Sequence, residues 1–333
     1  MSEIFPVLGY DIGGTKIAAS LILSDGRILG KARIENKDTK PEKILPELVE
    51  TGKLLIKEAG LTCRQVKAIG IASPSPADIP NGIIVAPPNN KFWRNVHIKE
   101  YLSEELEIEA FFENDANAGV LAEWFFGAGK GCKNIVYLTM STGIGGGIIT
   151  NGHLVQGKSY YAGEIGHAVL EPGGIKCNCG LLGCYEAYCG GRALAQRMQR
   201  ELASQPEHPI VQFAGGKLED IDMLALEKAF IAKNDYAIKL WDEMSFRNAQ
   251  AFGIILNTLN PEKIILGTLA WAVGNIYIDP ILKYLPQFSW QETREACQIV
   301  PCELRNEIGS YAGPAVALNC LYEQGHYELP GKK

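Results

Sequence analysis

The sequence predicts an α/β fold made of two similar lobes. Residues 7–34 and residues 135–158 each show an apolar run, a glycine-rich turn, a β-rich run, a tight turn and a third β-rich run. Helix and strand patterns lie between these stretches, and 333 residues leave room for two ordinary domains. Such an internal repeat indicates two lobes whose glycine turns face each other across a cleft.

The elements between the two repeats follow from hydrophobic spacing. Residues 41–59 carry apolar side chains at helical spacing after a proline start, and Gly60 ends that pattern. Buried strands are predicted over residues 65–74 and 108–114, and a helix is predicted over residues 116–126. The first lobe therefore combines a meander of three strands with further helices and strands.

Composition favours a globular protein that acts on small solutes. Hydrophobic residues make up 47% of the chain and charged residues 21%, and the formal net charge is -6. Acidic residues are spread along the sequence, which does not give the basic surface of a nucleic-acid-binding protein. The N-terminus lacks the pattern of a signal peptide and no run of about 18 apolar residues occurs, so we expect a cytoplasmic protein with no membrane partner.

Residues 152–159 match the G-x-x-x-x-G-K-S spacing of a nucleotide-binding P-loop. A working P-loop needs a strand that ends at its first glycine and a helix that starts at its Lys-Ser pair, because amides of that helix hold the phosphates. Here Asn151 and Gly152 form a predicted hairpin turn, and no helical pattern begins after Ser159. The sequence therefore predicts a hairpin in this stretch, and a P-loop is the weaker interpretation.

Two other glycine turns are better candidates for phosphate binding. In YDIGGTK, residues 10–16, a strand delivers Asp11 to a turn whose backbone can approach a polyphosphate, and the carboxylate can reach hydrated Mg²⁺. Alone, the motif is equally consistent with a glycine hairpin and a capping aspartate. STGIGGG, residues 141–147, places a hydroxyl-rich turn at the equivalent point of the second repeat. The two turns together could clamp one phosphate chain.

A candidate catalytic carboxylate follows the strand at residues 108–114. Asn114 and Asp115 lie at the carboxyl end of that strand and just before a helix, where α/β proteins usually build their sites. A carboxylate at this point could accept a proton from a hydroxyl that attacks a phosphoryl group. Asn114 and Asp115 are also favoured helix N-caps, and spacing alone does not decide between the two roles.

Cysteine usage indicates a metal site in a reducing compartment. Four of the nine cysteines fall within residues 177–189, which favours a metal site over a disulfide framework. One imidazole and three thiols, a donor set that suits tetrahedral Zn²⁺, come from His167, Cys177, Cys179 and Cys184. A closed set of four ligands implies a structural ion. The alternative is a cluster of free thiols beside an unrelated histidine.

In combination and in this order, the motifs resemble those of the ROK family of sugar kinases and repressors, in the actin and hexokinase superfamily. The likeness spans nearly the whole chain and is carried by DIGGTK, PPNNKFWRNV, ENDANAGVLAEW, STGIGGGI, AGEIGH, CNCGLLGCYE and LNPEKIILG. It implies two ribonuclease H-like lobes with an interlobe cleft and a zinc-binding loop over residues 167–184. The expected lobes are residues 1–116, completed by a C-terminal helix at about 305–333, and residues 117–304.

The resemblance also implies roles for individual residues. The nucleotide would be bound by Asp11, Gly13, Gly14, Thr15, Lys16, Thr142, Gly143 and Gly267. Asp115 would be the general base, and the sugar would be surrounded by Asn89, Asn114, Asp115, Glu164, His167 and Glu186. His167 would serve both the sugar and the zinc ion, whereas the three cysteines would bind the zinc ion only.

Three positions depart from the family pattern. GTLAW, residues 267–271, replaces a glycine-rich run, so the bulkier Thr268 and Leu269 could narrow the adenine pocket. Ser75 stands where a glycine is common, at a turn beside the expected sugar site. Val316 replaces a usual glycine near the end of the chain, which concerns lobe packing more than chemistry.

The resemblance therefore implies a phosphotransferase that moves the γ-phosphate of ATP to the 6-hydroxyl of a hexose. Glucose is the first expectation, and N-acetylmannosamine, N-acetylglucosamine and fructose remain open. ATP, Mg²⁺ and a structural Zn²⁺ are the expected cofactors, and a homodimer or homotetramer is expected. A non-enzymatic sugar-responsive regulator is the alternative, although the ten residues before Asp11 are too few for a DNA-reading helix-turn-helix.

Overall fold

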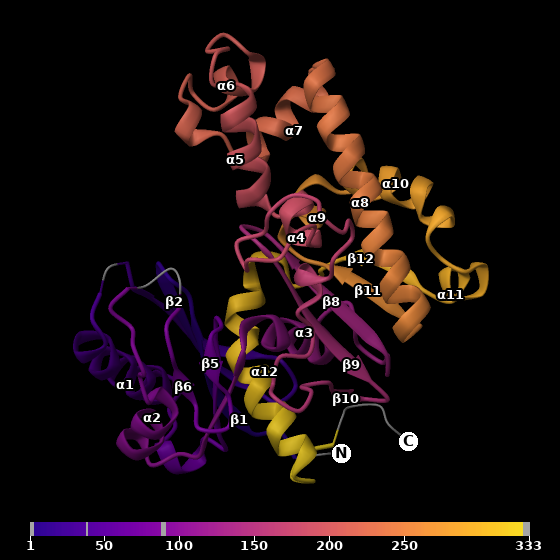
Figure 1. Cartoon of the computed structure of the whole chain (residues 1–333). Coiled ribbons are helices and arrows are strands. Elements are labelled where there is room, and N and C mark those ends of the chain that lie inside the picture. The colour runs from indigo at the N-terminus through magenta and orange to yellow at the C-terminus, as the bar shows by residue number, and fades with distance from the viewer. Residues whose placement is uncertain (1–2, 38, 88–90, 329–333) are drawn as a thin grey trace. The chain divides into compact units, whose positions relative to one another are not determined.

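The computed structural model describes residues 3–37, 39–87 and 91–328 (Figure 1). The chain forms two compact units. The first unit comprises Met1–Ile135, Gly147–Ala162 and Glu303–Lys333, and the second comprises Val136–Gly146 and Gly163–Cys302. The lobes expected from the sequence, divided after residue 116, are a different partition and remain a prediction.

A five-stranded sheet forms the centre of the first unit, in the order β3-β2-β1-β4-β7. Its strands are β1 (Pro6–Ile12), β2 (Lys16–Leu23), β3 (Ile28–Glu35), β4 (Ile69–Ser73) and β7 (Ala110–Asn114). The first three are antiparallel neighbours, which confirms the predicted meander, whereas β1, β4 and β7 run parallel. The parallel register pairs Asp11 with Ala72 and Ser73 with Asn114, so the carboxyl ends of these strands lie along one edge.

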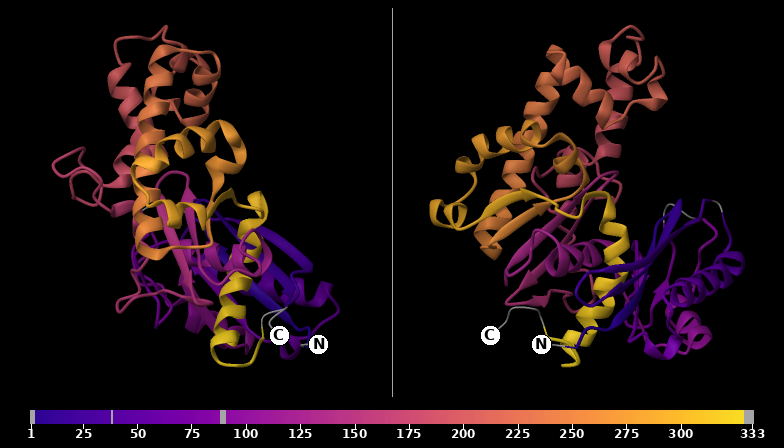
Figure 2. Two further views of the ribbon diagram at one scale, coloured as in Figure 1. Left: turned by 90° about the vertical axis from the view of Figure 1, so that its right-hand side faces the viewer. Right: turned by 180° about the vertical axis from the view of Figure 1, so that it is seen from behind.

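Helices cover both faces of the first sheet. α1 (Pro41–Glu58) and α2 (Ile98–Leu106) lie on one face, where the Tyr10 hydroxyl donates to the carbonyl oxygen of Leu48 at 2.9 Å. α12 (Ile308–Glu323) crosses β1 and β4 on the other face, and Figure 2 shows it in yellow beside the indigo strands. Because both faces are covered, β1 and β4 are apolar along most of their length.

Glycines let α12 approach the sheet closely. A Cβ atom on Gly9 would lie 2.0 Å from Cδ of Pro314. A Cβ atom on Gly70 would lie 1.9 Å from the carbonyl oxygen of Gly313. No real Cβ atom tolerates such distances to other atoms, so the crossing of α12 over β1 and β4 requires glycine at both strand positions.

Helix α3 (Asp115–Phe126) packs along α12 and fixes the chain that leads into it. The Glu123 side chain is fully buried in this helix. Its carboxylate accepts hydrogen bonds from the backbone amides of Glu303 at 3.2 Å and Leu304 at 2.9 Å. A buried carboxylate with several amide donors is satisfied, and here it anchors the segment that enters the first unit.

The second sheet has the order β10-β9-β8-β11-β12. Its strands are β8 (Ile135–Met140), β9 (Ile144–Thr150), β10 (His153–Leu154), β11 (Lys263–Leu266) and β12 (Gln298–Pro301). β9 and β10 are antiparallel, and Asn151 and Gly152 form the tight turn between them with φ of 52° and 81°. The predicted hairpin is therefore confirmed, and the first glycine of the G-x-x-x-x-G-K-S match, Gly152, lies in a β-turn.

Helices make up most of the second unit. They are α4 (Tyr185–Cys189), α5 (Gly191–Glu201), α6 (Pro209–Phe213), α7 (Met223–Ile231), α8 (Asp235–Leu259), α9 (Thr268–Val273), α10 (Asn275–Tyr284) and α11 (Gln291–Glu295). α8 is capped by Asn234, whose side-chain oxygen accepts from the amide of Ala237 at 3.0 Å. It packs against α4, α7 and α10. Among the described residues, no helix has the length and apolarity needed to cross a membrane.

We expect Gly70→Ala to destabilise the protein by about 1–3 kcal/mol or more, because the added methyl would collide with the α12 backbone. Urea unfolding followed by circular dichroism measures this change. Gly30→Ala is the matched control, since its Cβ would meet one flexible atom, Cδ2 of Leu55, at 3.0 Å. Equal stability of the two variants would contradict the close crossing of α12.

Candidate functional site

The first glycine turn joins β1 to β2 and is fixed by its own backbone. The amide of Gly13 donates to the carbonyl oxygen of Lys16 at 3.0 Å, and a Cβ on Gly13 would lie 2.5 Å from that oxygen. Asn36 braces the turn from below, because its side-chain nitrogen donates to the Gly13 carbonyl at 2.8 Å and its amide donates to the Thr15 carbonyl at 2.8 Å. No sequence signal identified Asn36, which is buried and distant along the chain.

Asn114 is the N-cap of α3. Its side-chain oxygen accepts from the amides of Ala116 at 2.9 Å and Asn117 at 3.4 Å, so one of the two roles left open by the sequence is confirmed for this residue. Asp115 is the first residue of the helix and is exposed. Its Oδ1 accepts from the amide of Ala116 at 2.8 Å. The cap therefore orients the backbone that carries the Asp115 carboxylate.

Ser75 supplies a contact that glycine cannot make. The side-chain nitrogen of Asn114 donates to the Ser75 hydroxyl oxygen at 2.8 Å. Ser75 follows β4 and Asn114 ends the neighbouring parallel strand β7, which explains how positions 39 apart in the sequence meet. The Ser75 hydroxyl thus helps to orient the Asn114 side-chain amide.

Asp11 and Asp115 lie at the same edge of the first sheet. Burial raises the pKa of the Asp11 carboxyl to about 7, and the negative charge of Asp115 adds to the increase. Asp11 also packs against the start of α12, where a Cβ on Gly309 would lie 2.9 Å from its Oδ2. Carboxylate oxygens are preferred ligands of Mg²⁺, and a divalent cation near Asp11 would offset the repulsion between the two carboxylates.

A third carboxylate, that of Glu113, directly precedes Asn114 and Asp115 in the chain. Burial raises the pKa of Glu113, whose Oε1 accepts from the Asn114 amide at 2.8 Å and from the side-chain nitrogen of Asn117 at 3.0 Å. Gln156 donates to the other oxygen at 2.5 Å. Glu113 therefore ties the strand that ends at Asn114 to the segment after β10, a connection that no motif indicated.

The second glycine turn lies between β8 and β9. It is closed by the Ser141 amide, which donates to the Gly143 carbonyl at 3.1 Å. The start of α5 holds it from outside, since the amides of Gly191 and Arg192 donate to the carbonyls of Ser141 and Thr142, each at 2.9 Å. Thr142 and Gly143 are thereby placed in a fixed loop, as a phosphate-binding turn requires.

A cavity of about 420 Å³ opens beside this turn in the second unit. Such a volume suits a small-molecule ligand. The turn contributes Ser141 and Thr142, and the helices around it contribute Arg192, Met223, Leu224, Glu227, Thr268, Leu269, Ala272 and Val273. Gly267 precedes α9 and donates its amide to the Leu138 carbonyl at 2.8 Å. Thr268 and Leu269, which were expected to narrow an adenine pocket, line the wall of this cavity.

The predicted metal ligands come together in the loop of the second unit. The ligand atoms of His167, Cys177, Cys179 and Cys184 all lie within 4.8 Å of one another. Cys179 Sγ and Cys184 Sγ are 3.6 Å apart, close to the spacing of about 3.8 Å between two sulfurs on a tetrahedral zinc ion. Cys177 and Cys184 are buried, and Cys179 is exposed. This donor set and spacing fit one tetrahedral metal ion.

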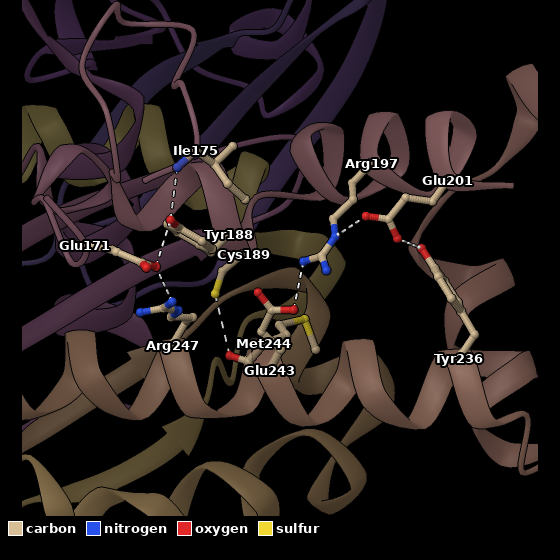
Figure 3. Close-up of polar contacts among 10 residues, drawn as sticks. All are labelled: Glu171, Ile175, Tyr188, Cys189, Arg197, Glu201, Tyr236, Glu243, Met244 and Arg247. Carbon is tan, nitrogen blue, oxygen red and sulfur yellow. Dashed lines mark hydrogen bonds and ion pairs between the residues drawn. The ribbon is translucent and has the colours of Figure 1, made fainter. Parts of the chain in front are cut away.

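Helix α8 holds the metal loop and α4 in place (Figure 3). Arg247 of α8 pairs with Glu171, and its guanidinium lies 4.5 Å from the centroid of the Tyr188 ring. The Tyr188 hydroxyl donates to Glu171 at 3.0 Å and accepts from the Ile175 amide at 3.0 Å. One turn earlier on α8, Glu243 pairs with Arg197 of α5 at 2.9 Å, and Arg197 also pairs with Glu201 of α5 at 2.9 Å. No local motif in the sequence indicates this network, because its members come from separate segments of the chain.

The remaining predicted site residues are placed as follows. Glu164 precedes a short 3₁₀ helix, Ile165–His167, and its carboxylate lies 3.9 Å from Nε2 of His167. Glu186 lies in the first turn of α4. Gly14, Thr15 and Lys16 follow Gly13 in the first turn, where Thr15 and Lys16 are exposed. Asn89 lies outside the described residues.

The chain belongs to the ROK family, because the model of that family matches residues 7–318. Among known relatives it is similar to the glucokinase of Thermotoga maritima, with 36% identity over 310 residues that cover 91% of this chain and 94% of the relative. Among solved structures it is similar to the ROK hexokinase from Thermus thermophilus, with 30% identity, a TM-score of 0.83 and coverage of 96% and 100% of the two chains.

A further similar structure is a ROK family glucokinase from Streptomyces griseus in complex with glucose and AMPPNP. The identity is 28%, the TM-score is 0.75, and the match covers 94% of this chain and 99% of that chain. These likenesses confirm the family predicted from the motifs and the α/β fold class that the resemblance implied.

We expect the free energy of unfolding of the metal-free protein to fall as pH rises from about 4 to about 7 through Asp11. Its native pKa of about 7 exceeds the value of about 3.9 in an unfolded chain, so over this range the native state keeps a proton that the unfolded state has released. Asp11→Asn should remove this part of the decline. Chemical denaturation across the pH range measures it.

Asp78→Asn is the control for the pH experiment. The side-chain hydrogen bond from Asn81 lowers the pKa of Asp78, so this substitution cannot remove a loss of stability on rising pH. An identical pH profile for wild type and Asp11→Asn would show that Asp11 has the same pKa in the native and unfolded states, against the proposed effect of burial and Asp115.

Proposed function

We propose that the protein is an ATP-dependent hexose kinase that transfers the γ-phosphate of ATP to the 6-hydroxyl of glucose. The observation that carries the proposal is the exposed Asp115 carboxylate at the carboxyl end of β7, oriented by the Asn114 cap. The glucokinase relatives, among them one with bound glucose and AMPPNP, support glucose and ATP as the substrates.

Asp115 is assigned the role of general base. As the sugar 6-oxygen attacks the γ-phosphorus, Asp115 accepts the hydroxyl proton, a new O–P bond forms, and the bond to ADP breaks. Bound Mg²⁺ supplies charge neutralisation on the phosphates. Asp11 is assigned to the hydrated ion, because its carboxylate lies near that of Asp115 at the end of β1. Proton removal and charge stabilisation are thus given to different carboxylates.

The substrates are assigned to the residues that the resemblance implied. We assign the triphosphate to the backbone of the turns at residues 13–16 and 142–143. The adenine base is assigned to the cavity beside Thr142, which Met223 and Leu269 line. The hydroxyls of the sugar are proposed to be bound by Asn89, Asn114, Glu164, His167 and Glu186. The Ser75 contact supports a fixed Asn114 amide as one of these partners.

A coupled assay of ADP release over a panel of sugars tests the proposal. Glucose is expected to give the highest kcat/KM, with N-acetylmannosamine, N-acetylglucosamine and fructose as the competing candidates. A higher value for one of those sugars would replace glucose as the substrate. No sugar-dependent ADP release with any of them would overturn the kinase and favour a sugar-responsive regulator.

We expect Asp115→Asn to lower kcat by about 10² to 10⁴, the usual cost of a lost general base. Glucose affinity should change little, because Asn keeps the size of Asp and one oxygen that accepts from the sugar hydroxyl. Steady-state kinetics measures kcat, and calorimetric titration measures the affinity for glucose. Turnover near that of the wild type would remove Asp115 from the proton transfer.

We also propose that the four-residue metal site holds a structural Zn²⁺. The imidazole and three thiols suit zinc, and all four positions are filled by protein ligands, which leaves none for a substrate. The bound ion would hold the thiols as thiolates and fix the loop that carries Glu164 and Glu186. Its role is therefore to order the sugar-binding residues.

The purified protein is expected to contain about one zinc ion per chain, and Cys177→Ser should lose it and melt at a lower temperature. Elemental analysis and thermal denaturation measure both effects. Cys63→Ser is the control, because Cys63 is not in the ligand group. Full zinc content in Cys177→Ser, or none in the wild type, would refute the zinc site.

A further inference from the structure

Glu186 makes a contact that its assignment to the sugar does not explain. It is the second residue of α4, directly after the buried Tyr185, and is itself half-buried. Its Oε2 accepts a hydrogen bond from the backbone amide of Ile144 at 2.8 Å. Ile144 follows Thr142 and Gly143 and begins β9, so this carboxylate holds the outgoing end of the second glycine turn.

The turn lies directly against the carboxylate. A Cβ atom on Gly143 would be 2.4 Å from Glu186 Oε2 and 3.3 Å from its Cδ. No side chain fits at position 143 while Glu186 keeps its place. Glycine at this position is therefore required by the Glu186 carboxylate as well as by any phosphate that approaches the backbone.

The turn is held at three backbone groups. The carbonyls of Ser141 and Thr142 accept from the first two amides of α5, and the amide of Ile144 donates to Glu186. The first two contacts join backbone to backbone, so they do not depend on the chemistry of one side chain. The third depends on the Glu186 side chain, so a movement or substitution of Glu186 can change the conformation of the turn.

Helix α4 gives this carboxylate a rigid base. The Tyr185 hydroxyl donates to the side-chain oxygen of Asn248, and the Cys189 thiol donates to the Met244 carbonyl at 3.5 Å. Both partners belong to α8. Because α4 is fixed on both sides of Glu186, a change in the carboxylate orientation is transmitted to the Ile144 amide more readily than to the helix.

We propose that Glu186 serves both substrates: Oε2 positions the phosphate turn while Oε1 accepts a hydroxyl of the sugar, so that one carboxylate couples sugar binding to nucleotide binding. The inference rests on the proposed kinase function for its sugar half. A carboxylate can accept at both oxygens at once. Any coupling through it is reciprocal, so the sugar strengthens nucleotide binding by the factor by which the nucleotide strengthens sugar binding.

Glu186→Ala and Glu164→Ala form the matched pair that tests this role. Each removes one carboxylate assigned to the sugar, but only Glu186 supports the turn. By calorimetry with magnesium AMPPNP and no sugar, Glu186→Ala should weaken nucleotide binding about tenfold, the cost of leaving an amide without its charged partner. Glu164→Ala should leave that affinity unchanged, and both variants should weaken glucose binding.

Two more variants guard against a folding defect. Glu186→Gln keeps an oxygen for the Ile144 amide, so it should bind AMPPNP like the wild type while it binds glucose more weakly. Gly143→Ala displaces the carboxylate, so it should weaken glucose binding measured without nucleotide. In a Glu186→Ala background the same Gly143→Ala change should no longer affect glucose binding, which is the signature of a shared interaction. Zinc content and melting temperature verify that each variant is folded.

Unchanged AMPPNP affinity in Glu186→Ala, or additive effects of Gly143→Ala and Glu186→Ala on glucose, would overturn the coupling and leave the kinase intact. A wild-type protein that binds AMPPNP but none of the sugars would instead overturn the proposed function and the sugar half of the inference. In that case the loss of AMPPNP affinity in Glu186→Ala would still support Glu186 as a positioning residue for the turn.

Discussion

The parallel pairing of β1, β4 and β7 is the constraint on which the first unit depends. Parallel strands end at the same edge of a sheet, so the register brings Asp11, the turn that carries Ser75, and the Asn114–Asp115 pair together. The glycine crossing of α12 secures this sheet from one face, and the Tyr10 hydroxyl bond to α1 secures it from the other. Two carboxylates are thereby kept close enough for their charges to interact.

In the second unit, the candidate site residues lie in loops that neighbouring helices hold in place. Its glycine turn is short and irregular, so the start of α5 and the Glu186 side chain hold it from outside. The metal loop has little regular structure and depends on its ligands and on Arg247 of α8 for its shape. The candidate site loops of this unit are held by contacts from α4, α5 and α8, whereas the candidate site residues of the first unit are placed by strand register.

Local chemistry could be predicted from the sequence, but long-range partners could not. The hairpin at Asn151 and the metal set starting at His167 each follow from neighbouring residue types, and the cap at Asn114 was one of the roles that the sequence left open. By contrast, Glu186 meets Ile144 across 42 positions, and Arg247 meets Glu171 across 76. Such pairs depend on how the helices pack, and a single sequence contains no periodic signal for them.

The central claim is that Asp115 removes the proton from the sugar hydroxyl that receives the phosphate. A crystal structure with glucose, AMPPNP and Mg²⁺ tests it most directly. The account predicts an Asp115 carboxylate oxygen within about 2.6–3.2 Å of the glucose 6-oxygen, which in turn faces the γ-phosphorus. An Asp115 side chain turned away from a fully bound glucose, with another group in contact with the 6-oxygen, would contradict it.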